Sequence, residues 1–259
     1  MGDMIYRPLI EGMQWSYSRV NSFWQCKYGW FLKYIHGSKK EDRFYTSYGS
    51  FMHRLIELYH RGLFTASEIL GIFLERFSSD VKGDRPSDSI VFKYIRAGAE
   101  YFKKLKPYQF EVIAVEEKIN FKIDGIPMTA IVDLIGLDED GEYVIVDNKS
   151  RDLRPRGKNI RPTLNDVTLD KMLRQLYIYA EAVKFKYGKY PKWLCFNCFK
   201  AGSFIEEPFR IEELHNTIEW VKEQVESIKN EEEFPPNPEY FFCKYLCDVS
   251  QDCEYSGMC

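Results

Sequence analysis

The chain has 259 residues, with 36 Lys and Arg against 39 Asp and Glu, and a formal net charge of -3. Apolar residues make up 45% and charged residues 29%, which excludes a disordered, collagen-like or low-complexity chain. No apolar run approaches the roughly 18 residues of a membrane span, and the first residues lack the apolar segment of a signal peptide. We therefore expect a cytoplasmic protein with no membrane partner, in which only a local basic groove could bind nucleic acid.

Helical periodicity dominates residues 1–110. It predicts helices over Ser18–Ile35, Ser47–His60, Thr65–Phe77 and Ser89–Leu105. From Glu111 the period changes to two, which predicts strands over Val112–Lys122, Met128–Gly136 and Tyr143–Asp147. Two further helices, Leu169–Val183 and Ile211–Ile228, flank a strand over Trp193–Phe199. We expect one integrated α/β domain with a helical part over 1–110, a core over 111–234 and a Cys-rich tail over 235–259.

The most informative polar residues interrupt two apolar strands. Asp133 lies in the middle of one, and the next ends with Asp147 and Lys149, which share a face because strand side chains alternate. Charges at such positions are costly unless they are paired or bound to metal. Two carboxylates and a lysine suit metal-assisted phosphodiester hydrolysis, in which the acids hold Mg²⁺ and the lysine serves the attacking water. Taken alone, the short Asp-x-Lys pattern favours an ordinary ion pair at a strand end.

Hairpin geometry decides whether the two acids meet. Asp133 lies opposite Asp147 only if the loop between their strands has an odd number of residues. A three-residue loop over 139–141 fits, with Gly141 in a left-handed conformation. A two-residue turn at Asp140 and Gly141 would place Asp133 opposite Asn148 instead.

Two helical patterns accompany the acids. Gly49 precedes His53 by four residues near the start of a predicted helix, and Gln175 precedes Tyr179 by four on a later one. Residues at this spacing lie on one side of a helix. Each pattern alone favours a structural explanation, a half-buried histidine or an ordinary helix edge.

Together these pieces resemble the RecB-like exonuclease branch of the PD-(D/E)XK nuclease superfamily, from about Trp15 to Cys253. Its Gly-x-x-x-His motif matches Gly49 and His53, its (D/E)xK element matches Asp147-Asn148-Lys149, and its Gln-x-x-x-Tyr element matches Gln175 and Tyr179. The resemblance implies a restriction-endonuclease-like core, a mixed central sheet flanked by helices. It also implies a nuclease that attacks single-stranded DNA ends and takes part in DNA repair, recombination or a phage-related process.

The same resemblance assigns roles to residues. It makes His53, Asp133, Asp147 and the Asn148 carbonyl the ligands of Mg²⁺ or Mn²⁺. Lys149 would serve the attacking water, and Gln175 and Tyr179 would hold DNA and support the site. Glu117 occupies a place where relatives often carry an acid. One departure is Pro127, which lies six residues before Asp133 instead of next to it.

Seven cysteines form the second distinctive pattern. One early cysteine and a C-terminal group resemble the iron–sulfur members of this branch, including CRISPR-adaptation and AddB-type nucleases. The resemblance implies a [4Fe–4S] cluster on Cys26, Cys243, Cys247 and Cys253, with Cys259 as a rival ligand. Zinc, or no ligand at all, remains an alternative. Cys195 and Cys198 lie in an apolar strand, where their spacing points them to opposite faces, so we interpret both as buried structural residues.

A basic loop follows the predicted catalytic lysine. It carries Lys149, Arg151, Arg154, Arg156, Lys158 and Arg161 against one acid, Asp152. Such a loop is well placed to contact DNA phosphates, although a solvated charged loop has the same composition. No nucleotide-binding P-loop is present, so unwinding would need a helicase or recombination partner. Two other function classes stay open: a catalytically silent DNA-binding subunit and a zinc-stabilised interaction module.

Overall fold

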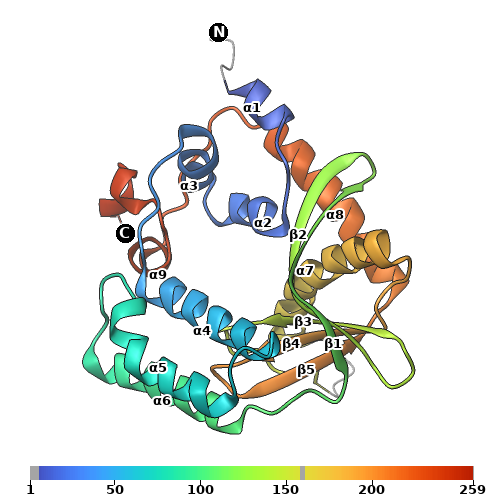
Figure 1. Cartoon of the computed structure of the whole chain (residues 1–259). Helices are drawn as coiled ribbons and strands as arrows, with labels where there is room; N and C mark the ends of the chain where they lie inside the picture. Colours follow the sequence, from blue (N-terminus) through green and yellow to red (C-terminus); the bar gives the residue numbers. More distant parts are fainter. Residues whose placement is uncertain (1–5, 158–160, 259) are drawn as a thin grey trace.

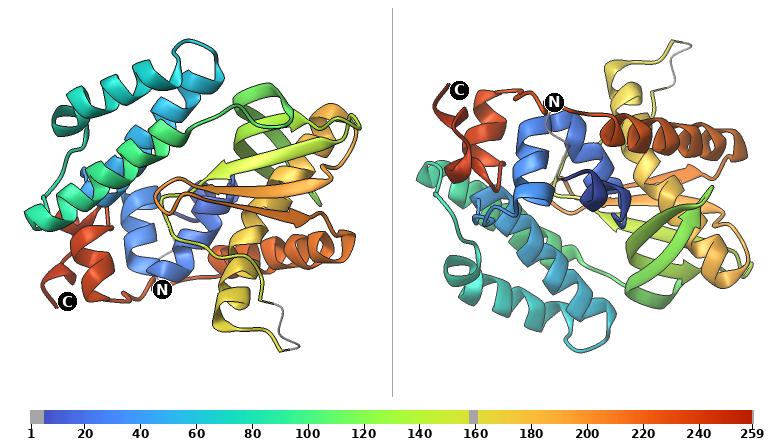
Figure 2. Two further views of the ribbon diagram at one scale, coloured as in Figure 1. Left: turned by 90° about the horizontal axis from the view of Figure 1, so that it is seen from below. Right: turned by 90° about the horizontal axis from the view of Figure 1, so that it is seen from above.

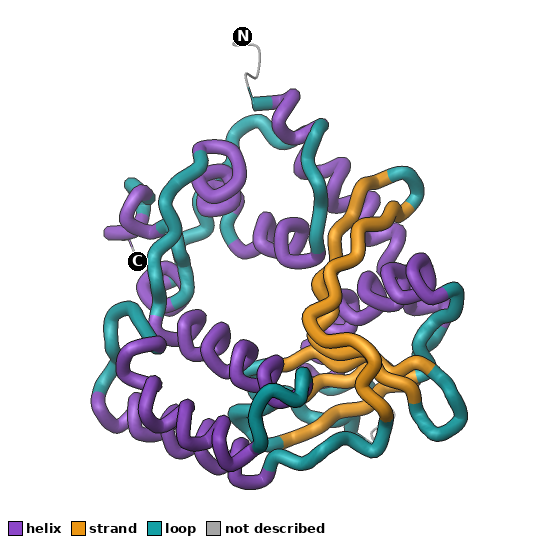
Figure 3. The backbone as a smooth tube through the Cα atoms, viewed as in Figure 1, coloured by secondary structure: helices purple, strands orange, loops and turns teal. Residues whose placement is uncertain are grey.

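The computed structural model describes residues 6–157 and 161–258. Its centre is a five-stranded mixed sheet in the order β1–β2–β3–β4–β5 (Figures 1 and 3). The strands are β1 Glu111–Ile123, β2 Ile126–Leu137, β3 Tyr143–Asn148, β4 Trp193–Cys198 and β5 Ser203–Pro208. Strands β1 to β3 form an antiparallel meander, β3 and β4 pair in parallel, and β4 and β5 form an antiparallel hairpin. The predicted α/β fold with helices around a mixed sheet is confirmed.

Helices surround this sheet on both sides. Their bounds are α1 Arg7–Glu11, α2 Tyr17–Gln25, α3 Lys27–Phe31, α4 Phe44–His60, α5 Ala66–Asp80, α6 Asp88–Lys104, α7 Leu164–Tyr187, α8 Ile211–Lys229 and α9 Tyr240–Tyr245. One hydrophobic core joins α1–α3, α7 and α8 to the sheet. A second core lies within α4–α6, which stand to one side of the sheet, away from α7 and α8 (Figure 2). Within the described ranges, no helix has the length and apolarity needed to cross a membrane.

The helix predicted over Ser18–Ile35 is wrong as a single element. The chain breaks at Cys26, which is extended with φ -163° and ψ 112°. Its Sγ then accepts the Gly29 N–H at 3.4 Å and caps the start of α3. After α3 the chain continues as a π-helical turn, Leu32–His36. A regular 3.6-residue periodicity cannot reveal a break whose cause is a side chain turned back onto the backbone.

Strand β5 was not predicted, because Ser203–Pro208 contains two glutamates and ends in proline. It pairs on one side only, with β4, and an edge strand tolerates both features. Helix α7 also begins earlier than periodicity predicts. Thr163 and Asp166 form a reciprocal capping box that starts the helix at Leu164.

The β2–β3 hairpin has the predicted loop. The Asp138 N–H donates to the Glu142 carbonyl at 2.9 Å, which leaves three residues outside the ladder. Gly141 takes the expected left-handed conformation, with φ +74°. The register pairs Leu137 with Tyr143 and continues to Leu134 opposite Val146. Asp133 and Asp147 are therefore next in register.

The C-terminal segment packs against the part of the chain between α2 and α4 (Figure 1). Tyr28 donates to Glu254 at 3.1 Å, and its ring lies 5.0 Å from that of Tyr255. Asp248 pairs with Lys33 at 2.6 Å and accepts the Glu41 N–H at 2.7 Å. Residues more than 200 positions apart thus lie side by side.

Candidate active site

Neighbouring strands bring three acids together. On β1, Glu116 lies between the pairs Val115–Leu134 and Glu117–Val132, so it lies opposite Asp133 of β2. On the other side of β2, Asp147 of β3 also lies opposite Asp133. Asp133 Oδ2 accepts the backbone N–H of Asn148 at 2.7 Å. Asp133 and Asp147 are almost fully buried, 7% and 2% exposed. Three neighbouring strands therefore bring three carboxyl groups close together.

Helix α4 adds an imidazole to these acids. His53 Nδ1 lies 3.3 Å from Asp133 Oδ2, and ligand atoms of His53, Glu116 and Asp133 all lie within 4.8 Å of one another. The backbone of Asn148 is within hydrogen-bonding reach of the same ring. Burial lowers the pKa of His53, which keeps the imidazole neutral, the form that binds metals.

Lys149, Gln175 and Tyr179 form a connected chain beside Asp147. Lys149 Nζ lies 2.6 Å from Asp147 Oδ2 and donates to Gln175 Oε1 at 2.8 Å. The amide nitrogen of Gln175 donates to Asp147 Oδ1 at 2.8 Å and to the Tyr179 hydroxyl at 2.7 Å. Burial raises the pKa of Tyr179 well above its usual value, so this hydroxyl stays protonated. The two polar groups of Gln175 thus hold the lysine and the acid in a fixed relation.

The charges at this site are unbalanced. Burial, followed by the Asp147 charge, raises the pKa of Asp133 to about 8, and burial with the Asp133 charge raises the pKa of Glu116 to about 7. Asp147 Oδ2 has an ion-pair partner, but it accepts no hydrogen bond although it is buried. A divalent cation would relieve both features, and carboxylate oxygens with one imidazole suit Mg²⁺ or Mn²⁺. The residues present therefore fit the cation that the sequence implies.

Glu116, and not Glu117, lies at the site, so that expectation is wrong. A bulge at Ile113 shifts the β1 register by one residue, and without it Glu117 would share the face of Asp133. Glu117 instead pairs with Lys186 on α7. Glu116 has φ +52°, which is uncommon for a residue with a side chain and is typical of strain kept at functional sites. The alternation of apolar and polar residues could not identify Glu116, because it does not show where a bulge shifts the register.

The cysteines separate into two groups. Burial raises the pKa of Cys253, and the nearby Cys26 and Cys243 thiols add to the effect. Burial likewise raises the pKa of Cys247 to about 11, with contributions from Cys243 and Cys253. The sulfurs from the α2–α3 break and the tail therefore lie near one another, while Cys259 lies outside the described residues.

Cys195 and Cys198 belong to the other group. Both are fully buried on β4, and each packs into a different hydrophobic cluster. Their predicted place as structural residues on opposite faces is confirmed.

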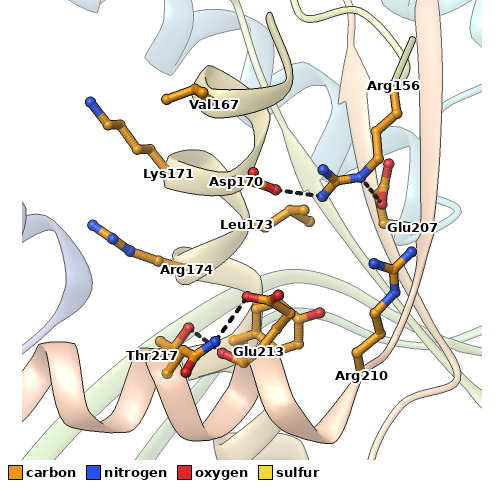
Figure 4. A pocket seen from close by; sticks show the side chains of 12 residues that line it. Arg156, Val167, Asp170, Lys171, Leu173, Arg174, Glu207, Arg210, Glu213 and Thr217 are labelled. Carbon is orange, nitrogen blue, oxygen red and sulfur yellow. Dashed lines mark hydrogen bonds and ion pairs between the residues drawn. The ribbon is translucent and has the colours of Figure 1, made fainter. Parts of the chain in front are cut away.

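Part of the basic loop is engaged within the protein. Arg156 pairs with Asp170 at 2.6 Å and with Glu207 at 2.7 Å (Figure 4), so its charge is already matched by two acids of the protein. These ion pairs line a cavity of about 390 Å³ between α7, β5 and α8. Arg151 and Arg154 are exposed, whereas Lys158 lies outside the described residues.

The chain can be compared with known families and structures. A family model described as the PD-(D/E)XK nuclease superfamily matches residues 14–259. No curated protein sequence gives a significant match. The solved structure of a "putative exonuclease" from Eubacterium rectale is similar, with 15% identity, a TM-score of 0.51, and coverage of 98% of this chain and 93% of that one. At this identity, the likeness shows the fold alone.

Two other solved structures are more distant. A protein named SSO0001 has 14% identity and a TM-score of 0.32, with coverage of 98% of both chains. A repair endonuclease from Pyrococcus abyssi has 20% identity and a TM-score of 0.20, with coverage of 45% of this chain and 39% of that one. Scores this low support no argument.

Proposed function

The chain belongs to the PD-(D/E)XK nuclease superfamily, and from that premise we propose that it degrades single-stranded DNA from its ends. The observation that carries the proposal is the connected set of His53, Asp133, Asp147, Lys149 and Gln175, in which acids, base and amide meet at one end of the sheet. A purely structural ion pair would need neither the neutral imidazole nor the additional buried acids. A catalytically silent subunit would have no use for the complete set.

The residues that would hold the cation are His53, Asp133, Asp147 and the Asn148 carbonyl, with Glu116 as an additional acid. When bound, Mg²⁺ or Mn²⁺ supplies charge for the phosphate and lowers the pKa of water. Lys149 is held by Asp147 and Gln175, so its ammonium is fixed where a phosphodiester would approach. This fixed position suits a group that orients the attacking water.

The charge of the loop that follows Lys149 supports the proposal that DNA is the substrate. The exposed Arg151 and Arg154 directly follow the lysine and can contact phosphates along a strand. The sequence has no P-loop, so strand separation would have to come from a helicase or recombination partner.

We further propose that Cys26, Cys243, Cys247 and Cys253 hold a [4Fe–4S] cluster. The thiols of Cys26 and Cys243 influence the pKa of Cys253, and those of Cys243 and Cys253 influence the pKa of Cys247, as expected for residues that share one cluster. Because Cys26 and the tail are far apart in sequence, the cluster would tie the two chain ends together. Iron and sulfide analysis of anaerobically purified protein tests this assignment.

The activity can be tested with single-stranded DNA labelled at either end, the matching duplex and a closed single-stranded circle. We expect Mg²⁺- or Mn²⁺-dependent shortening of the linear strand, an intact circle, and no cleavage in EDTA. Cleavage of the circle would make the protein an endonuclease. Binding without cleavage under every condition would instead favour the silent DNA-binding subunit.

A further inference from the structure

A second charged group lies on α7, next to the candidate active site. Tyr17, at the start of α2, donates its hydroxyl hydrogen to the Lys171 carbonyl at 3.2 Å. Burial raises the pKa of Tyr17 to about 12, and the charges of Arg174 and Arg151 oppose this rise. Basic residues of α7 and of the loop after β3 therefore act on the same hydroxyl.

Arg174 is held in place without a carboxylate. Its guanidinium carbon lies 4.8 Å from the ring centre of Trp220 on α8, and the Trp220 ring lies 6.1 Å from that of Tyr17. In Figure 4, Lys171 and Arg174 point to the same side of α7, away from the ion pairs of Arg156. In the part of the chain that the structure describes, Lys171 and Arg174 form no ion pair. Their positive charge is therefore available to an external anion.

Lys171 and Arg174 lie on α7 close to Gln175, a residue of the candidate active site. Lys171, Gln175 and Tyr179 follow one another at intervals of four, so they form one stripe along the helix. Lys171 lies four residues, about 6 Å along the helix axis, from Gln175, which contacts both Asp147 and Lys149. An extended strand that reaches Lys149 and follows α7 toward its start would pass over the charged group on α7.

We propose that Arg174, together with Lys171 and Arg151, binds the backbone phosphate next to the one that is cleaved. This inference rests on the proposed nuclease function and adds a binding subsite to it. A guanidinium held over an indole ring keeps N–H groups free, and these match the oxygens of a phosphodiester. Because this contact already orders the side chain, less conformational entropy is lost when the phosphate binds. The subsite would hold the cleaved diester in register with the acids.

Binding of short fluorescent single-stranded oligonucleotides tests the subsite. Anisotropy is measured in the Asp147→Asn background, which keeps the DNA intact, with one methylphosphonate moved along the strand to neutralise each phosphate in turn. Arg174→Gln retains much of the side-chain stem but removes the charge. Arg210→Gln is the matched control, because Arg210 lines the same cavity but is separated in Figure 4 from Lys171 and Arg174.

We expect Arg174→Gln to weaken binding roughly tenfold and to lower the slope of log affinity against log salt by about 0.7, the value for one contact on a single strand. One methylphosphonate position should weaken binding by a similar factor and have no further effect in Arg174→Gln. Additive effects at every position, or equal effects of Arg174→Gln and Arg210→Gln, would overturn the inference. Arg174→Lys keeps the charge, so its affinity for DNA should lie between that of the chain with Arg174 and that of Arg174→Gln. Thermal melting checks that each variant is folded.

The same experiment separates the subsite from the proposed activity. If the native chain binds DNA with this phosphate dependence but never cleaves it, the nuclease proposal fails and the subsite stands. If it cleaves DNA but Arg174→Gln has unchanged KM and kcat, the subsite fails alone. If it neither binds nor cleaves, both are wrong.

Discussion

Lys149 gives the sharpest test of the candidate site. Lys149→Met keeps the length of the side chain but removes the ammonium that lies 2.6 Å from Asp147. We expect hydrolysis to fall by roughly 10²- to 10⁴-fold, the range for loss of a positioned acid or base. DNA binding should be largely retained, because the contacts proposed for other basic residues do not involve Lys149.

The same change should affect stability, since Asp147 is only 2% exposed. Removal of one partner from a buried ion pair costs about 3–5 kcal/mol. For a chain of this size each kcal/mol lowers Tm by about 2–4 °C, so a loss of roughly 6–20 °C is expected in EDTA. Excess Mg²⁺ should restore part of this loss, because the unpaired carboxylate regains a cation.

Differential scanning fluorimetry with EDTA or Mg²⁺, together with the end-labelled cleavage assay, measures both effects. Lys192→Met is the control, because Lys192 pairs at the surface with Asp138 and Asp140. Such pairs contribute about 1 kcal/mol or less. Near-normal cleavage by Lys149→Met, or the same Tm as Lys192→Met in EDTA, would refute the role given to Lys149.

Other expectations concern the acids and the cysteines. The raised pKa values of Asp133 and Glu116 mean that both acids hold protons until pH 7–8, so cation affinity, followed by Mn²⁺ calorimetry, should fall by roughly 100-fold or more from pH 8 to pH 6. Glu116→Gln should weaken Mn²⁺ binding at pH 8 by roughly tenfold, whereas Glu117→Gln should leave it unchanged. Weaker Mn²⁺ binding in Glu117→Gln alone would show that Glu117, and not Glu116, belongs to the site. Cys26→Ser should lower Tm and the iron content, whereas Cys195→Ser should leave iron unchanged; the opposite result would mean that the cysteines are wrongly grouped.

The sequence predicted what depends on local rules. The loop before β3 has a glycine at the position that needs a left-handed conformation, so the register of Asp133 and Asp147 followed from loop length and strand alternation. Glu116 could not be predicted in this way. The bulge at Ile113 changes which residue faces the site, and β1 carries acids at both candidate positions.

Other features depend on contacts between distant segments. The break at Cys26 depends on a thiol that caps the next helix and lies near the tail. The pairing of Arg156 with Glu207 needs β5 beside the loop, and the two glutamates and the proline of β5 weaken its signal as a strand. The spacing of apolar residues shows which face of a segment is buried, but it does not show which distant segment packs against that face.

The meander of β1–β3 has a consequence for how the protein folds. Its strands are joined by short hairpins, and such local pairing forms quickly. Yet this pairing brings Glu116, Asp133 and Asp147 together before α7 supplies Gln175. Repulsion between these carboxylates should therefore slow the formation of the meander. A divalent cation that bridges the acids would remove this barrier, so we expect Mg²⁺ to accelerate refolding as well as to stabilise the folded state.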